Sequence, residues 1–393
     1  MQLHSSVLKS AIMKTKFLYS LLLLIPFWLS CESDDLPIKD DDNNDDDKTE
    51  IKWNDAANKS SNALITSFWN NGGQYFNTDN SGNTTFQYWP NAHGLDVLID
   101  AYLRTNDNSY KSYFDKWYVG VKSKNGNSWK NEYYDDMEWN ALALLRAYKA
   151  TNDTKYKDAS LELWGYIKEG WNDNAGGGIT WKKGMEYSKN ACSNGPAAIL
   201  AARLYQEFGN EDDKEWAFKI YNWQKSTLVN LNTGAVWDNI NSNSGEIKKD
   251  WVFTYNQGTY IGAAVELHKI TNEKSYLIDA SLAADYTLSS LVENSVLKSE
   301  GTGDGGLFKG IFIRYFTQLI IQGRLDKPVR DRYLQFINFN AETLWINGTN
   351  TQGILFGPNW RMKPSSSTGL TEQLSGCMLI ESMAFLQKEG FIK

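Results

Sequence analysis

The feature that most limits how this chain can fold is a turn that recurs between helical patterns. Three copies are Thr105-Asn106-Asp107, Thr151-Asn152-Asp153 and Thr271-Asn272-Glu273, and in each a tyrosine follows the acidic residue by three positions. Gly209-Asn210-Glu211 is a looser copy. Asn or Gly is suited to end one helix, and an acidic residue is suited to begin the next. Successive copies lie 46, 58 and 62 residues apart, which is typical of stacked helical hairpins.

Twelve helical patterns follow residue 51, with two kinds of connection between them. The short turns follow the even-numbered patterns, whereas long connections lead into them, so all long loops are expected on one side of the fold. No convincing strand alternation lies between the helices. We therefore predict an all-α domain over residues 51–393, in which six helical hairpins close into a ring. The predicted helices cover residues 52–70, 91–105, 108–123, 136–150, 154–169, 190–208, 212–229, 256–271, 274–292, 306–323, 328–347 and 371–389.

The even-numbered patterns share polar or glycine-rich starts, among them Asn190-Ala191-Cys192, Asn256-Gln257-Gly258 and Asp304-Gly305-Gly306. A ring of such helices would bring these starts together around one cup. The fourth pattern begins at Asp135 and Asp136, whose side chains would diverge by about 100° on a helix. Such a pair could act on one bond from two directions, as glycosidase chemistry requires. Alternatively, both carboxylates could cap the helix.

The first 30 residues predict an export signal rather than part of the fold. Lys14 and Lys16 precede an apolar run over residues 17–29, which is too short to span a bilayer and is typical of a signal peptide. The run ends at Cys31 in a sequence that resembles a bacterial lipobox. This resemblance implies cleavage before Cys31 and acylation of its thiol. An uncleaved anchor and ordinary secretion are the alternatives.

Residues 31–50 are strongly acidic. From residue 32 to residue 50 the chain carries eight Asp and two Glu against two Lys, so we expect a disordered, solvated tether. Its start resembles the acidic export signal of surface-exposed lipoproteins. Once these 8 net negative charges and the three lysines of residues 1–30 are removed from the total of −7, residues 51–393 carry only −2. A nearly neutral domain argues against a nucleic-acid partner, which would favour a basic patch.

Cysteine and histidine are scarce in the predicted domain. Cys192 and Cys377 lie in apolar or small-residue helical contexts, so we expect buried free thiols, although an envelope location would permit a bridge. His93 and His268 are the only histidines after residue 50, so we predict no metal site.

Tryptophans are frequent in the long loops. Indoles on polar loops commonly stack on sugar rings, whereas others are expected to be structural. These residues are Trp89, Trp129, Trp171, Trp181, Trp237, Trp251 and Trp360.

Six segments, in this order, make the chain resemble glycoside hydrolase family 76, the bacterial endo-acting α-1,6-mannanases, over residues 53–390. Two adjacent aspartates alone are a weak motif, whereas the ordered set is specific. The segments are Trp89-Pro90-Asn91-Ala92-His93-Gly94-Leu95-Asp96, Asp135-Asp136-Met137-Glu138-Trp139, Lys189-Asn190-Ala191-Cys192-Ser193-Asn194-Gly195-Pro196, Tyr255-Asn256-Gln257-Gly258-Thr259, Asp304-Gly305-Gly306-Leu307-Phe308-Lys309-Gly310 and Leu374-Ser375-Gly376-Cys377.

The resemblance implies an (α/α)6 barrel and a retaining mechanism, with Asp135 as the nucleophile and Asp136 as the acid/base. A retaining pair needs carboxyl groups ~5–5.5 Å apart, which adjacent residues can provide. The helix dipole and free N–H groups would keep Asp135 ionised. Its charge, with aromatic cover from Tyr134 or Trp139, would raise the pKa of Asp136.

Further residues are predicted to bind the sugar. His93 and Asp96, one helical turn apart, could hold hydroxyl groups, although His93 could equally be structural. The polar residues at the helix starts suit a neutral sugar, and any of them could instead cap its helix. Lys309 would need a buried acidic partner such as Asp304. The predicted sugar-binding residues are His93, Asp96, Tyr134, Asn190, Asn194, Trp237, Asn256, Gln257, Asp304, Phe308, Lys309 and Trp360.

Together, these features predict an outer-membrane lipoprotein, facing the exterior, that hydrolyses the backbone of α-1,6-mannan internally. We expect a monomer that touches the membrane only through its lipid and needs neither a metal nor a cofactor. One alternative is a surface glycan-binding lipoprotein that uses the same Trp-rich cup without catalysis. Another is a mannan transglycosidase, because relatives in fungal walls are thought to transfer rather than hydrolyse.

Overall fold

Twelve α-helices follow one another along residues 50–393, the part of the chain that this computed structural model describes. The predicted signal peptide, the lipidation site Cys31 and the tether up to residue 49 lie outside the described residues. Within residues 50–393, no helix is both long enough and apolar enough to cross a membrane. The helices are α1 (Trp53–Phe68), α2 (Tyr88–Thr105), α3 (Asn108–Lys124), α4 (Tyr134–Thr151), α5 (Thr154–Lys168), α6 (Gly195–Phe208), α7 (Glu211–Leu228), α8 (Thr254–Thr271), α9 (Lys274–Ser290), α10 (Asp304–Gln322), α11 (Lys327–Thr343) and α12 (Leu370–Lys388).

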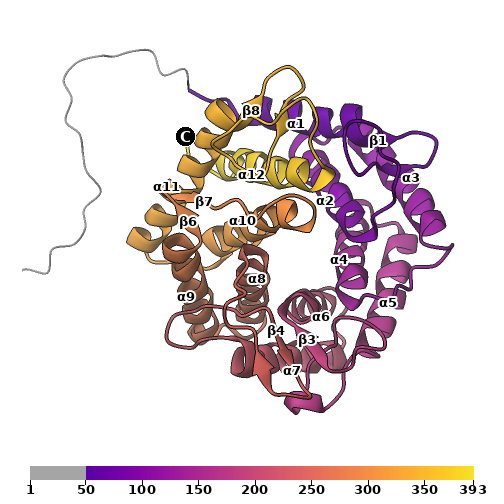
Figure 1. Cartoon of the computed structure of the whole chain (residues 1–393), viewed down its shortest axis with the longest axis vertical. Coiled ribbons are helices and arrows are strands. Elements are labelled where there is room, and N and C mark those ends of the chain that lie inside the picture. Colours follow the sequence, from indigo (N-terminus) through magenta and orange to yellow (C-terminus); the bar gives the residue numbers. More distant parts are fainter. Residues whose placement is uncertain (1–49) are drawn as a thin grey trace, which may run out of the picture. The chain divides into compact units, whose positions relative to one another are not determined.

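The helices of residues 51–393 form a ring of six hairpins (Figure 1). Each even-numbered helix packs against the next one, and α12 packs against α2 to close the ring. The odd-numbered helices lie outside them (Figure 1). Helices α8 and α12 are buried along most of their length on all sides, as inner helices must be. The predicted all-α fold with the (α/α)6 arrangement is therefore confirmed.

The recurring turn ends four inner helices in the left-handed conformation, which Asn and Gly tolerate best. Asp107 and Asp153 then cap the next helix, because each side chain accepts a hydrogen bond from the N–H two residues on. The turn after α10 differs, since Gly323 remains right-handed and Arg324 takes a φ of 44°. The four helix-ending residues are Asn106, Asn152, Gly209 and Asn272, with φ of 57°, 58°, 72° and 60°.

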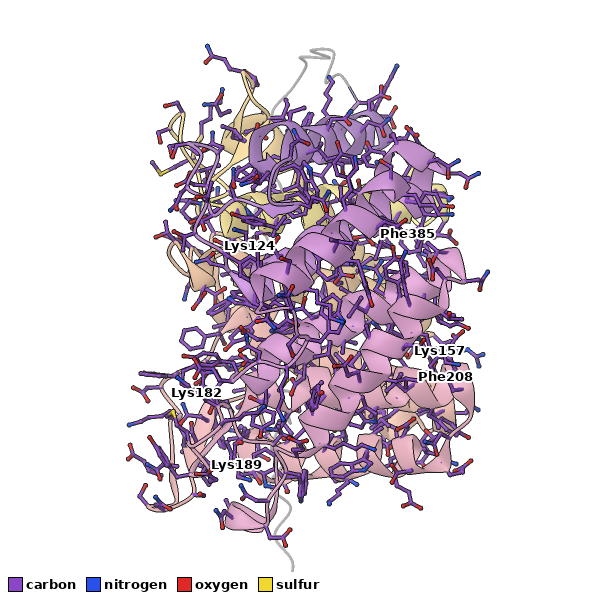
Figure 2. All side chains as sticks on the ribbon, turned by 90° about the vertical axis from the view of Figure 1, so that its right-hand side faces the viewer. Lys124, Lys157, Lys182, Lys189, Phe208 and Phe385 are labelled. Atoms are coloured by element: carbon purple, nitrogen blue, oxygen red, sulfur yellow. The ribbon has the colours of Figure 1, made fainter. Side chains whose placement is uncertain are left out.

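The long loops gather at the opposite end from these turns. Figure 2 shows Lys182 and Lys189, from the loop before α6, at one end of the ring, and Phe208 and Phe385, near the ends of α6 and α12, at the other. The loops contain short antiparallel strands that the sequence analysis missed, because two or three residues are too few for an alternating pattern. The strands are β1 (Trp69–Asn70), β2 (Tyr75–Phe76), β3 (Ser188–Asn190), β4 (Asn239–Asn241), β5 (Glu246–Ile247), β6 (Val292–Glu293), β7 (Val296–Leu297), β8 (Thr349–Asn350) and β9 (Leu355–Phe356).

Asn and Gln side chains near the starts of four inner helices fasten the loop that precedes each helix. In every case the carboxamide oxygen accepts a hydrogen bond from a loop N–H, and the carboxamide nitrogen donates to a loop carbonyl. The pairs are Asn91 with Phe76, Asn194 with Ile179, Gln257 with Val236, and Gln373 with Phe356 and Ile354. The prediction that Asn194 and Gln257 bind sugar is corrected, because both carboxamides are occupied by backbone groups.

Charged side chains of three inner helices form ion pairs inside the ring. Asp96 on α2 accepts a hydrogen bond from Arg146 on α4 over 2.5 Å. Asp100 binds Arg146 over 2.5 Å and Arg314 on α10 over 2.7 Å. The predicted sugar-binding role of Asp96 is also corrected, because its carboxylate is paired with Arg146 and does not line the cavity among the long loops.

The chain enters the ring at the end opposite the long loops. Arg104, in the last turn of α2, donates to the side-chain oxygens of Asn54 and Asn58 on α1 over 2.7 and 2.8 Å. Arg104 also forms a buried ion pair with Glu381 on α12. The first turn of α1 is therefore held at the end opposite the long loops.

Candidate active site

A cavity of about 660 Å³ opens among the long loops, over the start of α4. Asp135 and Asp136, in the first turn of α4, both line it. The predicted sugar-binding residues Asn190, Asp304 and Phe308 line it with them. The remaining lining residues are Trp89, Tyr133, Trp139, Trp181, Met185, Ser188, Cys192, Asp238, Asn239, Trp251, Phe253 and Tyr255.

Neither aspartate is the N-cap of α4. That position belongs to Tyr133, which has extended backbone and makes no capping hydrogen bond through its side chain. Oδ1 of Asp135 is enclosed and has no hydrogen-bond partner within residues 50–393. Buried polar atoms without a partner are uncommon in proteins. The position of Asp135 therefore favours contact with a ligand over a purely structural role.

Burial raises the pKa of both carboxyl groups. For Asp135, burial raises the pKa to about 6, against the opposing effects of Cys192 and of the first-turn N–H groups. For Asp136, burial and the negative charges of Asp135, Asp304 and Glu132 raise the pKa well above its usual value. The helix start does not hold the pKa of Asp135 low, because burial outweighs it. Neighbouring negative charges raise the pKa only of Asp136, which favours Asp135 as the member of the pair that ionises first.

Aromatic rings from α8, α10 and the loop before α8 form one wall of the cavity. Tyr255 and Phe308 stack with ring centres 3.9 Å apart and planes 11° apart. Phe253 lies 5.5 Å from Phe308, and Trp251 lies 6.4 Å from Phe253. Trp251 is 49% exposed, so this wall extends from the buried centre to the solvent. Such a row of rings suits the C–H faces of consecutive sugars.

Polar groups from α10 and from strand β3 line the same cavity as the carboxylate pair. Oδ1 of Asp304, at the start of α10, accepts a hydrogen bond from Nε1 of Trp89 over 3.1 Å. Oδ1 of Asn190 accepts one from the Ser188 hydroxyl over 2.8 Å. Both side chains retain further capacity to bind sugar hydroxyl groups.

His93 is packed beneath this cavity rather than in its wall. Its ring centre lies 4.8 Å from that of Trp139 and 5.6 Å from that of Trp89, both of which line the cavity. Burial lowers the pKa of His93 to about 3, so the ring is neutral. Both ring nitrogens are buried and make no hydrogen bond within residues 50–393, so the packing of His93 does not decide between the two interpretations from the sequence.

Lys309 is buried, and its contacts differ from those predicted. Its ammonium group donates to the Pro358 carbonyl over 2.7 Å and lies 4.2 Å from the ring centre of Trp360. Burial lowers its pKa to about 7, against the opposing charge of Glu300. Asp304 is therefore not the partner. Lys309 and Trp360 hold the loop before α12 and do not line the cavity.

Two predictions selected the neighbour of the residue that lines the cavity. Tyr134 is buried outside the cavity, whereas Tyr133 lines it. Trp237 likewise lies outside the cavity wall, whereas Asp238 forms part of it. Successive side chains point in different directions both in an extended segment and at a helix start, and the sequence alone did not fix which direction each would take.

Asp238 and Cys192 line the cavity, although the sequence analysis did not select them as site residues. Oδ1 of Asp238 accepts a hydrogen bond from the Asn256 side chain over 3.0 Å. Asn256 therefore affects the cavity by holding the carboxylate of Asp238 in place. Burial raises the pKa of Asp238, and burial with nearby carboxylates raises that of Cys192. Cys192 and Cys377 are buried free thiols, as predicted. In the sequence, the feature that could have pointed to Asp238 is its position as a single acidic residue beside Trp237 in a long loop.

The ring of helical hairpins, with two consecutive, partly buried carboxyl groups at its loop end, defines an (α/α)6-barrel protein of the glycoside hydrolase class. Residues 52–393 match the model of glycosyl hydrolase family 76. The chain therefore belongs to this family.

Similar proteins include enzymes with solved structures. An inactive variant of the GH76A alpha-1,6-mannanase from Salegentibacter sp. HEL1_6, with two consecutive aspartates changed to asparagine, has been solved in complex with alpha-1,6-mannotriose. It is 48% identical to this chain, with a TM-score of 0.83, over 85% of this chain and 99% of its own. A family 76 mannosidase from Bacteroides thetaiotaomicron is 20% identical, with a TM-score of 0.75, over 86% of this chain and 100% of its own, and supports the fold alone.

A more distant similarity comes from fungi. A putative mannan endo-1,6-alpha-mannosidase of Schizosaccharomyces pombe is 24% identical over 331 residues, which cover 76% of this chain and 74% of the relative.

Proposed function

We propose that this protein is a retaining endo-acting α-1,6-mannanase, with Asp135 as the nucleophile and Asp136 as the acid/base. The observation that carries this proposal is the pair of consecutive carboxyl groups that open into one cavity at the start of α4. The similar GH76A alpha-1,6-mannanase is inactive when two consecutive aspartates are changed to asparagine. At 48% identity, this supports the same assignment for Asp135 and Asp136.

The reaction proceeds in two balanced steps. In the first, the ionised carboxylate of Asp135 attacks the anomeric carbon while Asp136 gives its proton to the glycosidic oxygen, which leaves as the 6-hydroxyl group of the next mannose. In the second, Asp136 takes a proton from water, and the water oxygen displaces Asp135 from the anomeric carbon. Two inversions at the same carbon retain the configuration. Asp136 ends the cycle protonated and Asp135 ionised.

The electrostatics of the site match these roles. A nucleophile must be ionised at the working pH, and the pKa of about 6 for Asp135 allows this. An acid must hold its proton, and burial with the charges of Asp135, Asp304 and Glu132 keeps the pKa of Asp136 high. When Asp135 becomes esterified to the sugar, its charge disappears. The pKa of Asp136 then falls, which suits its change from acid to base.

Release of reducing sugar from a linear α-1,6-mannan tests this function. The wild-type protein should release oligosaccharides whose new ends first appear in the α configuration by NMR. Asp135→Asn and Asp136→Asn should each lower kcat by at least about 100-fold while the protein remains folded. A fully active variant of either kind would contradict the assignment. Binding of mannan without release by the wild-type protein would instead favour the glycan-binding alternative.

The transglycosidase alternative is tested in the same assay with added acceptor. If the protein is a hydrolase, new reducing ends should appear at the rate of bond cleavage in dilute substrate. If it is a transferase, cleavage should produce longer oligosaccharides with no net gain of reducing ends.

We also propose that the chain is anchored through an acylated Cys31 on the outer surface of the outer membrane. The supporting observations are the lipobox-like sequence at Cys31 and the acidic residues that follow it. Labelled palmitate should enter the wild-type protein and not Cys31→Ser, and protease added to intact cells should digest the wild-type protein. Labelling without digestion would contradict the surface location.

A further inference from the structure

Another cavity, of about 390 Å³, lies between the inner helices near the short turns. Its lining comes from α2, α4, α6, α8 and α10, and each lining residue lies in the second half of its helix. Arg203, for example, is five residues before Phe208, which Figure 2 places at the end opposite Lys182 and Lys189. This cavity shares no lining residue with the candidate active site, so the two are separate.

Positive charge predominates in the lining of this cavity. Four cationic side chains face a single carboxylate, that of Glu266, and they are Arg146, Lys149, Arg203 and Lys269. The acids that pair with Arg146 and Lys149 do not line the cavity. Residues 51–393 carry a net charge of only −2, so this local excess of positive charge does not come from the overall composition.

Glu266 is shared by two of these cations. Its carboxylate, on a residue that is 1% exposed, lies 2.7 Å from Nε of Arg203 and 2.8 Å from Nζ of Lys269. Arg203 also donates to the Gln318 carboxamide oxygen over 2.9 Å, but that group is neutral. One carboxylate therefore balances two positive charges that are largely removed from water, and unbalanced charge in such a place is costly.

The cations also act on one another. Burial lowers the pKa of Lys269, and the charges of Arg203 and Lys149 lower this pKa further, against the opposing charge of Glu266. Lys149 is 55% exposed along its side chain, so the cavity is open to solvent on that side. A lysine has three N–H donors and an arginine five, and the bonds to Glu266 and Gln318 leave several of them for a ligand.

We propose that this cavity binds a small oxyanion of the phosphate class, held by Arg203, Lys269 and Lys149. An anion with two negative charges would offset the local excess, and ammonium and guanidinium groups are the usual donors to phosphate. The cavity volume lies within the range of small-molecule sites, so a phosphate ester would also fit. This site goes beyond the proposed mannanase function and does not depend on it.

Calorimetric titration with inorganic phosphate at pH 7 tests the proposal, with chloride used to keep the ionic strength constant. The wild-type protein should bind one phosphate per chain in a saturable manner. Cations near helix C-termini also stabilise the helix dipoles without any ligand. If that is their whole role, phosphate will show no saturable binding, and the proposal is overturned.

Gln318→Glu is the most informative variant. The change preserves the size of the side chain and the oxygen that accepts from Arg203, and it places a carboxylate inside the cavity. This charge should raise the Kd for phosphate by at least about tenfold while the protein remains folded. Gln335→Glu, the same change at an exposed position of α11, is the matched control and should leave the Kd within about twofold. Equal effects in the two variants would contradict the assigned position.

Lys149→Gln provides a second variant, because this exposed lysine can be replaced at little cost to the fold. It should raise the Kd for phosphate by about three- to tenfold. If Gln318→Glu does not fold, this variant decides, and an unchanged Kd would overturn the proposal.

Competition with sugar separates this site from the active site. In Asp135→Asn, α-1,6-mannotriose should leave the Kd for phosphate unchanged, because the two cavities share no residue. Displacement of phosphate by the sugar would place the anion in the active site and overturn the proposal. Phosphate binding by a protein that cleaves no mannan would instead count against the proposed function alone.

Discussion

The carboxamide of Asn194 binds both backbone polar groups of Ile179, accepting from its N–H over 2.9 Å and donating to its carbonyl over 3.0 Å. Both residues are buried, so the loss of this carboxamide would leave an N–H and a carbonyl without partners. Asn194→Ala should therefore lower the free energy of unfolding by about 2–4 kcal/mol. Chemical denaturation followed by circular dichroism measures this change.

Gln335→Ala, an exposed change on α11, is the control and should stay within about 0.5 kcal/mol of the wild-type protein. If Asn194→Ala behaves like this control, the proposed fastening of the loop is not important for stability. If stability is unchanged while substrate binding is lost, the sugar-binding role predicted from the sequence would be restored.

Asp100 should stabilise the ring of inner helices. Burial raises its pKa, but Arg146 and Arg314 more than offset this effect, so its pKa is lowered overall. Asp100→Asn leaves two guanidinium groups without their shared carboxylate and should cost about 3–5 kcal/mol of unfolding free energy.

The pH dependence of this loss has a definite sign. A carboxyl group with a lowered folded-state pKa contributes stability above its unfolded pKa, and this contribution disappears as the pH falls through the folded-state value. The difference between wild type and Asp100→Asn should thus be constant near pH 5–7 and shrink below about pH 4. A constant difference down to acid pH would contradict an ionic role.

How much of this molecule could be predicted from its sequence depends on repetition. The ring was predictable because the turn at Asn106 recurs at Asn152 and Asn272 and because loop lengths alternate. The direction of side chains in extended loops was not predictable, as Tyr133 and Asp238 illustrate. Their directions are fixed by backbone pairing with distant segments, and one residue of shift reverses them.

The carboxamides at the helix starts were ambiguous for another reason. Asn190 and Asn194 are chemically identical and belong to one short segment, yet Asn190 lines the cavity and Asn194 binds Ile179. A donor and an acceptor that suit a sugar hydroxyl suit a peptide group equally well. Only the three-dimensional position separates these roles.

The pH profile of activity should have two limbs. The value of kcat/KM on linear α-1,6-mannan should rise through about pH 6 as Asp135 loses its proton, and fall at higher pH as Asp136 loses its own. These apparent values belong to the interacting pair.

Asp304→Asn removes a negative charge that helps to raise the pKa of Asp136, so the high-pH limb should move to lower pH. Asp158→Asn, an exposed change on α5, should leave both limbs in place. Movement of the high-pH limb to higher pH in Asp304→Asn would contradict this account.

The carboxyl group of Asp136 should reduce the stability of the fold at neutral pH. Its folded-state pKa is raised by burial and by Asp135, so the folded protein binds this proton more tightly than the unfolded chain does. Ionisation of the unfolded chain above about pH 3.8 therefore favours unfolding, and the penalty grows until the pH reaches the folded-state pKa.

Asp136→Asn cannot ionise and escapes this penalty. We expect this inactive variant to melt at a higher temperature than the wild-type protein at pH 7, and the gap to close as the pH falls below about 4. Asp158→Asn should show no such gap, because Asp158 is exposed. A lower melting temperature for Asp136→Asn at pH 7 would mean that the carboxyl group is held by favourable contacts, and it would then be a structural residue rather than an acid kept protonated for catalysis.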